Sequence, residues 1–141
     1  YSKIVSAISV YPYAYGISND VEGLKKVIAG LEYENGITVT PYRGEDVYFQ
    51  WDYPCMWPAA TCIMYKALKR LGLYEDAKRI AKKYIHILDE IFEKTGALYE
   101  KYDVVTGKIG IGEEYGTPEM LGWTAGIYLS LQQYLETGKL I

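Results

Sequence analysis

The chain has 141 residues, half of them apolar, and a formal net charge of −3 at pH 7. A chain of this size and apolar content buries one ordinary hydrophobic core, which excludes a disordered polypeptide. The mild, mixed charge excludes the basic surface of a nucleic-acid-binding protein. No apolar run reaches the roughly 18 residues of a membrane helix and no signal-peptide pattern opens the chain, so we expect a cytoplasmic protein with no membrane partner.

The aromatic content is the unusual feature of the composition. Sixteen tyrosines and three tryptophans gather around predicted loops more than along helix cores, which favours a ligand surface. Cys55 and Cys62 lie seven positions apart across a predicted helix start, too far to bridge, and we expect free thiols. With the single histidine, His86, they lack the spacing of a metal site, so we expect packing roles for all three and neither a metal nor a cofactor.

The first third of the chain contains one predicted helix. Residues 1–17 carry mixed apolar spacing followed by proline and glycine, which indicates a short element leading into a tight loop. Asn19 and Glu22 resemble a capping box ahead of apolar residues at helical spacing, which predicts a helix from about Asp20 to Tyr33. Proline and glycine interrupt any regular pattern in residues 37–48, which predicts a loop.

Two further helices are predicted in the middle of the chain. Pro58 is well placed for the first turn of a helix that Gly72 ends, and a second helix runs from Tyr74 to Lys94 and closes at Gly96. We expect the apolar face of the second helix to be buried: Ala77, Ile80, Ala81, Tyr84, Ile87, Leu88 and Ile91. We expect its basic face to be solvated: Lys78, Arg79, Lys82 and Lys83.

A last helix is predicted from Trp123 to just before Gly138. The order is therefore helix, long aromatic loop, helix, short turn, helix, long loop, helix. Such alternation is typical of helical hairpins whose long loops share one end of the layer. We predict an all-α fold of helical hairpins forming part of an (α/α)6 toroid, with the long loops at one end. A helical-repeat scaffold is the weaker alternative, because no fixed residue period is visible.

The stretch from Leu98 to Trp123 (LYEKYDVVTGKIGIGEEYGTPEMLGW) is the strongest candidate for a functional site. Two carboxylates, Glu100 and Glu114, lie on either side of a glycine-spaced loop, with tyrosine and tryptophan rings close to each. Rings stack on the apolar faces of a pyranose, and carboxylate pairs cleave glycosidic bonds, so this set suits a sugar. The alternative is a solvated loop in which these residue types occur by chance.

Three motifs resemble the α,α-trehalases of glycoside hydrolase family 37. Residues 50–58 (QWDYPCMWP) are similar to the family's QWD signature. Residues 99–103 (YEKYD) are similar to its EKYD motif, and residues 112–126 (GEEYGTPEMLGWTAG) to its glycine-rich stretch. The motifs stand in the family's order, and looser similarity extends from Tyr11 to about Tyr128.

The resemblance implies a role for each matched residue. Glu100 falls on the family's catalytic base and Glu114 on its sugar-binding carboxylate, with the neighbouring Glu113 as an alternative ligand. The other residues expected to bind substrate are Gln50, Trp51, Asp52, Tyr115 and Trp123. The family's catalytic acid is an Asp on an earlier hairpin, and no residue of this chain matches it.

Some positions depart from the family pattern. Met56 stands where the signature has a small residue, and Ala125 stands where the last motif has Asn. Such positions shape substrate contacts, so the resemblance implies a small carbohydrate of the α-glucoside class, with trehalose as one candidate, rather than trehalose alone. The related toroid glucosidases of family 63 share a glutamate on such a loop and stay open as an alternative family.

Since the chain begins with Tyr1, we expect a piece of a longer protein. Residues 1–141 would form a single domain, the C-terminal part of a trehalase-like inverting glycosidase, supplying the base and part of the sugar pocket. We expect this chain alone to be inactive because the acid is absent, and to self-associate or to bind the missing part of the toroid. The alternative is a non-catalytic carbohydrate-binding or regulatory module of the same fold. A helical packing module without a ligand is the third reading, and the order of the motifs argues against it.

Overall fold

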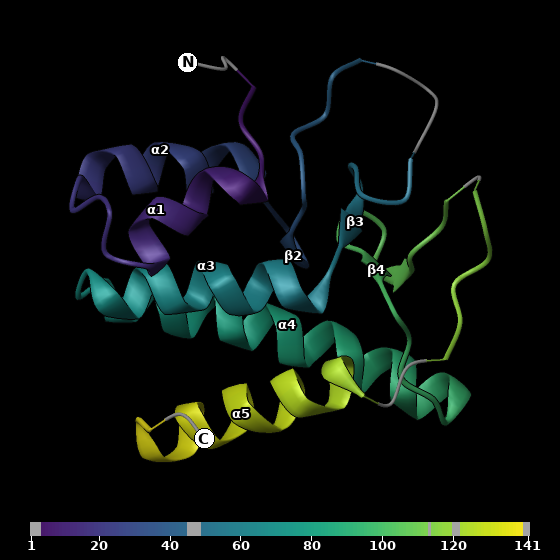
Figure 1. Ribbon diagram of the computed structural model, residues 1–141. Coiled ribbons are helices and arrows are strands. Elements are labelled where there is room, and N and C mark those ends of the chain that lie inside the picture. Colours follow the sequence, from purple (N-terminus) through teal and green to yellow (C-terminus); the bar gives the residue numbers. More distant parts are fainter. Residues whose placement is uncertain (1–3, 45–48, 113, 120–121, 140–141) are drawn as a thin grey trace.

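The computed structural model describes residues 4–44, 49–112, 114–119 and 122–139 (Figure 1). The described residues form a largely helical layer with two small antiparallel sheets. The helical elements are η1 (Ala7–Val10), α1 (Tyr11–Ala14), α2 (Val21–Leu31), α3 (Pro58–Arg70), α4 (Tyr74–Thr95) and α5 (Trp123–Thr137). The strands are β1 (Glu32–Tyr33), β2 (Gly36–Ile37), β3 (Cys55–Met56), β4 (Tyr102–Asp103) and β5 (Lys108–Ile109).

Helix α2 differs from its prediction at both ends. Asp20, rather than Asn19, is the N-cap: its Oδ1 accepts a hydrogen bond from the backbone N–H of Gly23 at 2.9 Å. Asn19 instead accepts from the guanidinium of Arg70 on α3. The helix stops at Leu31 because the next residues form β1, which pairs with β2 in a tight hairpin.

The three other long helices confirm the sequence prediction closely. Pro58 opens α3, where its missing N–H is an unpaired helix donor in any case. Gly96 and Gly138 end α4 and α5 in the left-handed conformation, each with φ of 74°. A side chain at either position would be strained, which explains why these helices end there.

The core lies between α3, α4 and α5, which pack against one another, and continues to α1 and α2 on the other side of α3 (Figure 1). All seven residues predicted to face inward from α4 are buried. Tyr84 of this face donates a hydrogen bond to the backbone carbonyl of Thr124 on α5 at 3.2 Å, so its hydroxyl is satisfied in the core. Leu131 and Tyr134 complete the packing from the α5 side.

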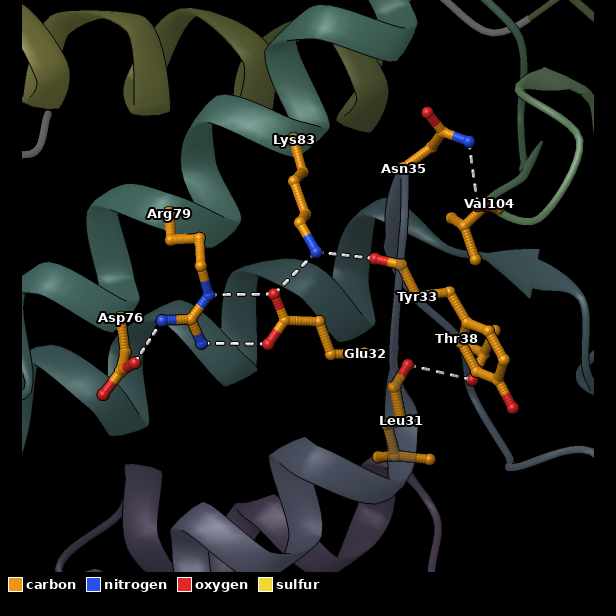
Figure 2. Close-up of polar contacts among 9 residues, drawn as sticks. All are labelled: Leu31, Glu32, Tyr33, Asn35, Thr38, Asp76, Arg79, Lys83 and Val104. Carbon is orange, nitrogen blue, oxygen red and sulfur yellow. Dashed lines mark hydrogen bonds and ion pairs between the residues drawn. The ribbon is translucent and has the colours of Figure 1, made fainter.

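The basic face of α4 points outward as predicted, but Arg79 and Lys83 also form ion pairs, and Lys83 is partly buried. Arg79 donates from Nε and Nη2 to the two carboxylate oxygens of Glu32, each at 2.9 Å, and Lys83 reaches Oε1 of Glu32 at 2.8 Å (Figure 2). Lys83 also donates to the backbone carbonyl of Tyr33 at 2.6 Å. Long side chains from α4 therefore hold the β1–β2 hairpin. His86, predicted to pack, is in fact exposed on α4 near Glu90.

The β1–β2 hairpin supports the loop end of the layer. Asn35 donates to the carbonyl of Val104 from its backbone N–H and from its side chain, both at 3.0 Å. Gly36 has φ of 154°, and a Cβ there would lie 2.6 Å from the sulfur of Met56. Only glycine lets the hairpin approach the neighbouring strand this closely.

The long loops lie together at one end of the layer, whereas the short α3–α4 turn lies at the opposite end (Figure 1). Strand β4 lies between β3 and β5, so a three-stranded sheet joins the loop before α3 to the loop before α5. None of the helices in the described parts of the chain is long and apolar enough to span a bilayer.

Candidate functional site

The three-stranded sheet brings two of the sequence motifs together. Cys55 pairs with Asp103 and Met56 with Tyr102, and the N–H of Val104 donates to the carbonyl of Pro54 at 3.1 Å. The residues that precede β3 and β4 along the chain are Gln50 to Pro54 and Tyr99 to Lys101. The QWD and EKYD motifs, fifty positions apart, therefore share one sheet.

Glu100 lies just before β4 on a supported stretch of backbone. Its N–H donates to the carbonyl of Pro118 at 3.1 Å, beside a bridge between Tyr99 and Glu119. Its Oε2 accepts a hydrogen bond from the hydroxyl of Tyr115 at 2.9 Å and lies 3.4 Å from Nζ of Lys101. The Glu100 side chain is 12% exposed, so this carboxylate is partly shielded from water and paired on one oxygen.

Lys101 is fully buried, and sequence reasoning did not identify it as a site residue. Its ammonium lies 5.5 Å from the ring centroid of Trp57 and 4.6 Å from that of Tyr115. A ring face attracts a cation through its quadrupole, which lowers the cost of burying the charge. The burial itself could not be read from the sequence, since Lys beside Glu in a loop is ordinarily solvated.

Three tryptophans form a cluster next to Lys101. The rings of Trp51 and Trp57 stack with centroids 3.7 Å apart, and Trp123 meets Trp57 edge-on at 5.7 Å. Trp57 is buried and donates from Nε1 to the carbonyl of Gln50 at 2.7 Å. Trp51 stacks on Trp57 but is itself 51% exposed, so much of its ring stays accessible from solvent.

Gln50 is buried and joins the third motif. Its Nε2 donates to the carbonyl of Tyr115 at 2.8 Å. Its Oε1 has no hydrogen-bond partner among the described residues, although that oxygen is buried. Gly112 packs directly against the same amide, since a Cβ there would lie 2.7 Å from Oε1. Gln50 therefore ties the glycine-rich loop to the QWD motif.

Asp52 and Glu114 lie outside the hydrogen-bonded group around Glu100. The carboxylate of Asp52 is paired with Arg43 and accepts from the N–H of Tyr53 at 3.0 Å. Arg43 was not predicted as a site residue, and no motif marks it. Glu114 is exposed, and the structure gives it no hydrogen bond within the described residues. Glu113, the alternative ligand, lies outside those residues.

The surroundings of Cys55 and Tyr115 shift their pKa values. Burial, with the nearby negative charges of Asp103 and Asp52, raises the pKa of the Cys55 thiol to about 11, against the opposing charge of Lys101. Burial and the hydrogen bond to Glu100 raise the pKa of Tyr115. Both groups therefore stay protonated at neutral pH, and Tyr115 acts as a hydrogen-bond donor. Both cysteines are free thiols, as predicted.

The described part of the chain contains no group of three or more His, Cys, Asp or Glu side chains that could hold a metal ion. The arrangement instead offers one anchored carboxylate, Glu100 before β4, and an exposed ring, Trp51. A second carboxylate, Glu114 after β5, has no hydrogen bond among the described residues. A layer of helical hairpins with these residue types at its loop end is compatible with the helical class of glycoside hydrolases, which use carboxylates and rings on their loops.

Comparisons with known proteins identify the family. Residues 9–136 match the family model described as Trehalase. Trehalase from Tenebrio molitor is 34% identical over 113 residues, which cover 76% of this chain and 20% of that protein. Trehalase from Homo sapiens is 33% identical over 105 residues, which cover 72% of this chain and 18% of that protein. The chain belongs to the trehalase family.

A solved structure shows the same fold. Neutral trehalase Nth1 from Saccharomyces cerevisiae superposes with a TM-score of 0.78 at 23% identity, over 97% of this chain and 25% of that chain. The prediction of helical hairpins forming part of an (α/α)6 toroid is thereby confirmed. The chain spans about a fifth of the length of the curated relatives named above.

Proposed function

We propose that this chain supplies the catalytic base and part of the sugar pocket of an inverting trehalase-like glycosidase. The observation that carries the proposal is the geometry of Glu100: a largely shielded carboxylate, held on Oε2 by Tyr115 and Lys101, at the end of the layer where Trp51 exposes its ring. Membership of the trehalase family supports a glycosidic substrate. Trehalose, a small α-glucoside, is the candidate substrate. The cytoplasmic location stays a prediction.

The chemistry requires two carboxyl groups on opposite faces of the sugar. Glu100, ionised, takes a proton from a water molecule as the water oxygen bonds to the anomeric carbon. The bond from that carbon to the glycosidic oxygen breaks, and a carboxylic acid protonates the leaving oxygen. Glu100 ends protonated, the acid ends ionised, and the anomeric configuration is inverted. The acid comes from a part of the enzyme that precedes this chain.

The remaining residues bind and orient the sugar. Trp51 stacks on an apolar face of the glycone, and Trp123 closes the edge of the aromatic cluster. Glu114 accepts hydrogen bonds from sugar hydroxyls. Gln50 supports the site indirectly, because its hydrogen bond holds the backbone of Tyr115. Asp52, paired with Arg43, shapes the edge of the proposed sugar pocket.

The test of the base is Glu100→Ala in the full-length protein that contains this chain, assayed with and without azide. We expect a loss in turnover of about a hundredfold to ten-thousandfold with nearly unchanged substrate affinity. Azide, a small nucleophile that needs no base, should restore turnover and give a glycosyl azide of inverted configuration. Glu93→Ala, an exposed carboxylate on α4, is the matched control and should keep full activity. Activity of Glu100→Ala within severalfold of wild type without azide would refute the proposal.

Glu114→Gln should give a different kinetic signature. A binding carboxylate that loses a charged hydrogen bond of about 1.5 to 3 kcal/mol raises the apparent substrate constant roughly tenfold to a hundredfold. Turnover at saturation should change much less. A fall in turnover equal to that of Glu100→Ala would mean that the two roles are assigned the wrong way round.

The exposed ring of Trp51, stacked on buried Trp57, also suits a second candidate, a carbohydrate-binding module that turns nothing over. Titration of the isolated chain with trehalose, followed by tryptophan fluorescence, distinguishes the two functions. Binding by the 141-residue chain without any hydrolysis in the full-length protein would support the module. Hydrolysis in the full-length protein that depends on Glu100 supports the enzyme.

A further inference from the structure

The two oxygens of the Glu100 carboxylate have different surroundings. Oε2 receives both contacts that the structure gives this side chain, the hydroxyl of Tyr115 at 2.9 Å and the ammonium of Lys101 at 3.4 Å. No donor among the described residues reaches Oε1. A carboxylate fixed through one oxygen leaves the other in a defined position with its lone pairs free.

Few of the described groups compensate the positive charge of Lys101. The ammonium is fully buried, and Glu100 is the ion-pair partner that the described residues provide. Its other neighbours are the ring faces of Trp57 and Tyr115. A buried charge persists only when it is paired, so the interaction with Glu100 holds both side chains in place.

Tyr115 takes part in this arrangement through three separate groups. Its hydroxyl donates to Glu100, its ring covers Lys101, and its backbone carbonyl accepts from buried Gln50. Hydrogen bonds therefore hold Tyr115 at its hydroxyl and at its backbone, although 46% of the residue is exposed. These contacts hold Tyr115 in place beside Glu100.

We propose that Lys101 and Tyr115 are positioning residues that lock Oε2 of Glu100, so that Oε1 is the oxygen that takes the proton from water. This inference rests on the proposed function of Glu100 as the base, and it adds which oxygen acts and what aligns it. Proton transfer requires the accepting atom within hydrogen-bond reach of the attacking water. Loss of either contact lets the carboxylate rotate, which lowers turnover more than substrate binding.

The first experiment needs no catalysis. In the full-length protein labelled with nitrogen-15, the ammonium of Lys101 should give a slowly exchanging NMR signal at neutral pH, where exposed lysines lose theirs to exchange with water. Glu100→Gln and Tyr115→Phe should each shift or broaden that signal. Glu90→Gln, which removes the exposed partner of Lys94, is the matched control and should leave it unchanged. Circular dichroism confirms that each variant is folded.

The second experiment measures steady-state kinetics in the full-length protein. Tyr115→Phe keeps the ring over Lys101 and removes one hydroxyl, and Lys101→Met keeps the length of the side chain and removes its charge. Each should lower kcat by about tenfold to a hundredfold, the effect of a lost hydrogen bond to a charged group, while KM stays within about threefold. Tyr74→Phe and Lys82→Met, exposed on α4, are the matched controls and should leave both constants unchanged.

The outcomes separate this inference from the proposed function. The positioning role is refuted if the Lys101 signal is absent or is unchanged in both variants, or if Tyr115→Phe raises KM without lowering kcat. Retained activity in Glu100→Ala would instead refute the base, whatever the NMR signals show. Should Lys101→Met fail to fold, Tyr115→Phe decides the kinetic result by itself.

Discussion

Replacing Glu32 by Gln removes the negative charge at the centre of the contact between the β1–β2 hairpin and α4 (Figure 2). The carboxylate of Glu32 accepts from two nitrogens of Arg79, each at 2.9 Å, and from Lys83 at 2.8 Å. Gln has nearly the same size, but its amide presents one acceptor oxygen and no charge. The substitution therefore leaves two cations facing a neutral group.

The magnitude follows from the number and exposure of these contacts. A hydrogen bond to a charged group is worth about 1.5 to 3 kcal/mol, and solvent screening reduces such values at a surface. The Arg79 side chain is 43% exposed and that of Lys83 26%, so the three bonds are not additive at full strength. We expect Glu32→Gln to lower the free energy of unfolding by about 1.5 to 3 kcal/mol in total.

The effect should depend on pH in a defined direction. Burial by itself raises the pKa of Glu32, but the hydrogen bonds and charges of Arg79 and Lys83 offset this and hold the pKa below its usual value of 4.5. A lowered folded-state pKa gives stability that is fully present above the unfolded pKa of 4.5 and is lost as the pH falls from there through the folded pKa. The difference between wild type and Glu32→Gln should therefore be complete at pH 7 and should shrink below pH 4.5.

Urea denaturation of the 141-residue chain, followed by circular dichroism at several pH values, measures this difference. Glu75→Gln is the matched control, because it removes an exposed ion pair with Lys78 on the same helix, and it should be indistinguishable from wild type. Stability of Glu32→Gln within about 0.5 kcal/mol of wild type at pH 7 would show that the contact is only a surface pair.

Three further predictions concern the aromatic cluster, the cysteines and association. Trp57→Ala should lower the free energy of unfolding by about 3 to 5 kcal/mol, whereas Trp51→Ala should weaken sugar binding with little change in melting temperature; equal effects on both properties would contradict this division. Iodoacetamide should modify exposed Cys62 and spare buried Cys55, as mass spectrometry can show. Between pH 9 and about pH 11 the Cys55 thiol ionises in the unfolded chain but not in the folded one, so wild type should lose up to about 2 to 3 kcal/mol of stability that Cys55→Ala does not lose. Denaturation curves of the two proteins measure this difference. The 141-residue chain should self-associate through exposed apolar helix faces and hydrolyse nothing, so a monodisperse monomer at high concentration with measurable hydrolysis of aryl glucosides would refute the partial toroid.

The sequence by itself determined the limits of α3, α4 and α5 and indicated the family. Helix limits depend on local rules, the fixed φ of Pro58 at a first turn and the left-handed freedom of Gly96 and Gly138 at the ends, and these act over a few residues. The apolar face of α4 follows from helical periodicity alone. The three motifs likewise indicated the trehalase family, because they are short, ordered and rich in residues that a simple helical scaffold does not need.

Only the tertiary structure decided how these residues meet. Glu32 and Arg79 are 47 positions apart, and no local pattern shows that they pair. Nor does the pattern show that part of the basic face of α4 binds the β1–β2 hairpin. The burial of Lys101 between Trp57 and Tyr115 depends on a sheet formed by loops from different parts of the chain. The physical reason is the same in both cases: the free energy of a buried charge is set by the groups that surround it in space, and the sequence does not specify those groups until the chain has folded.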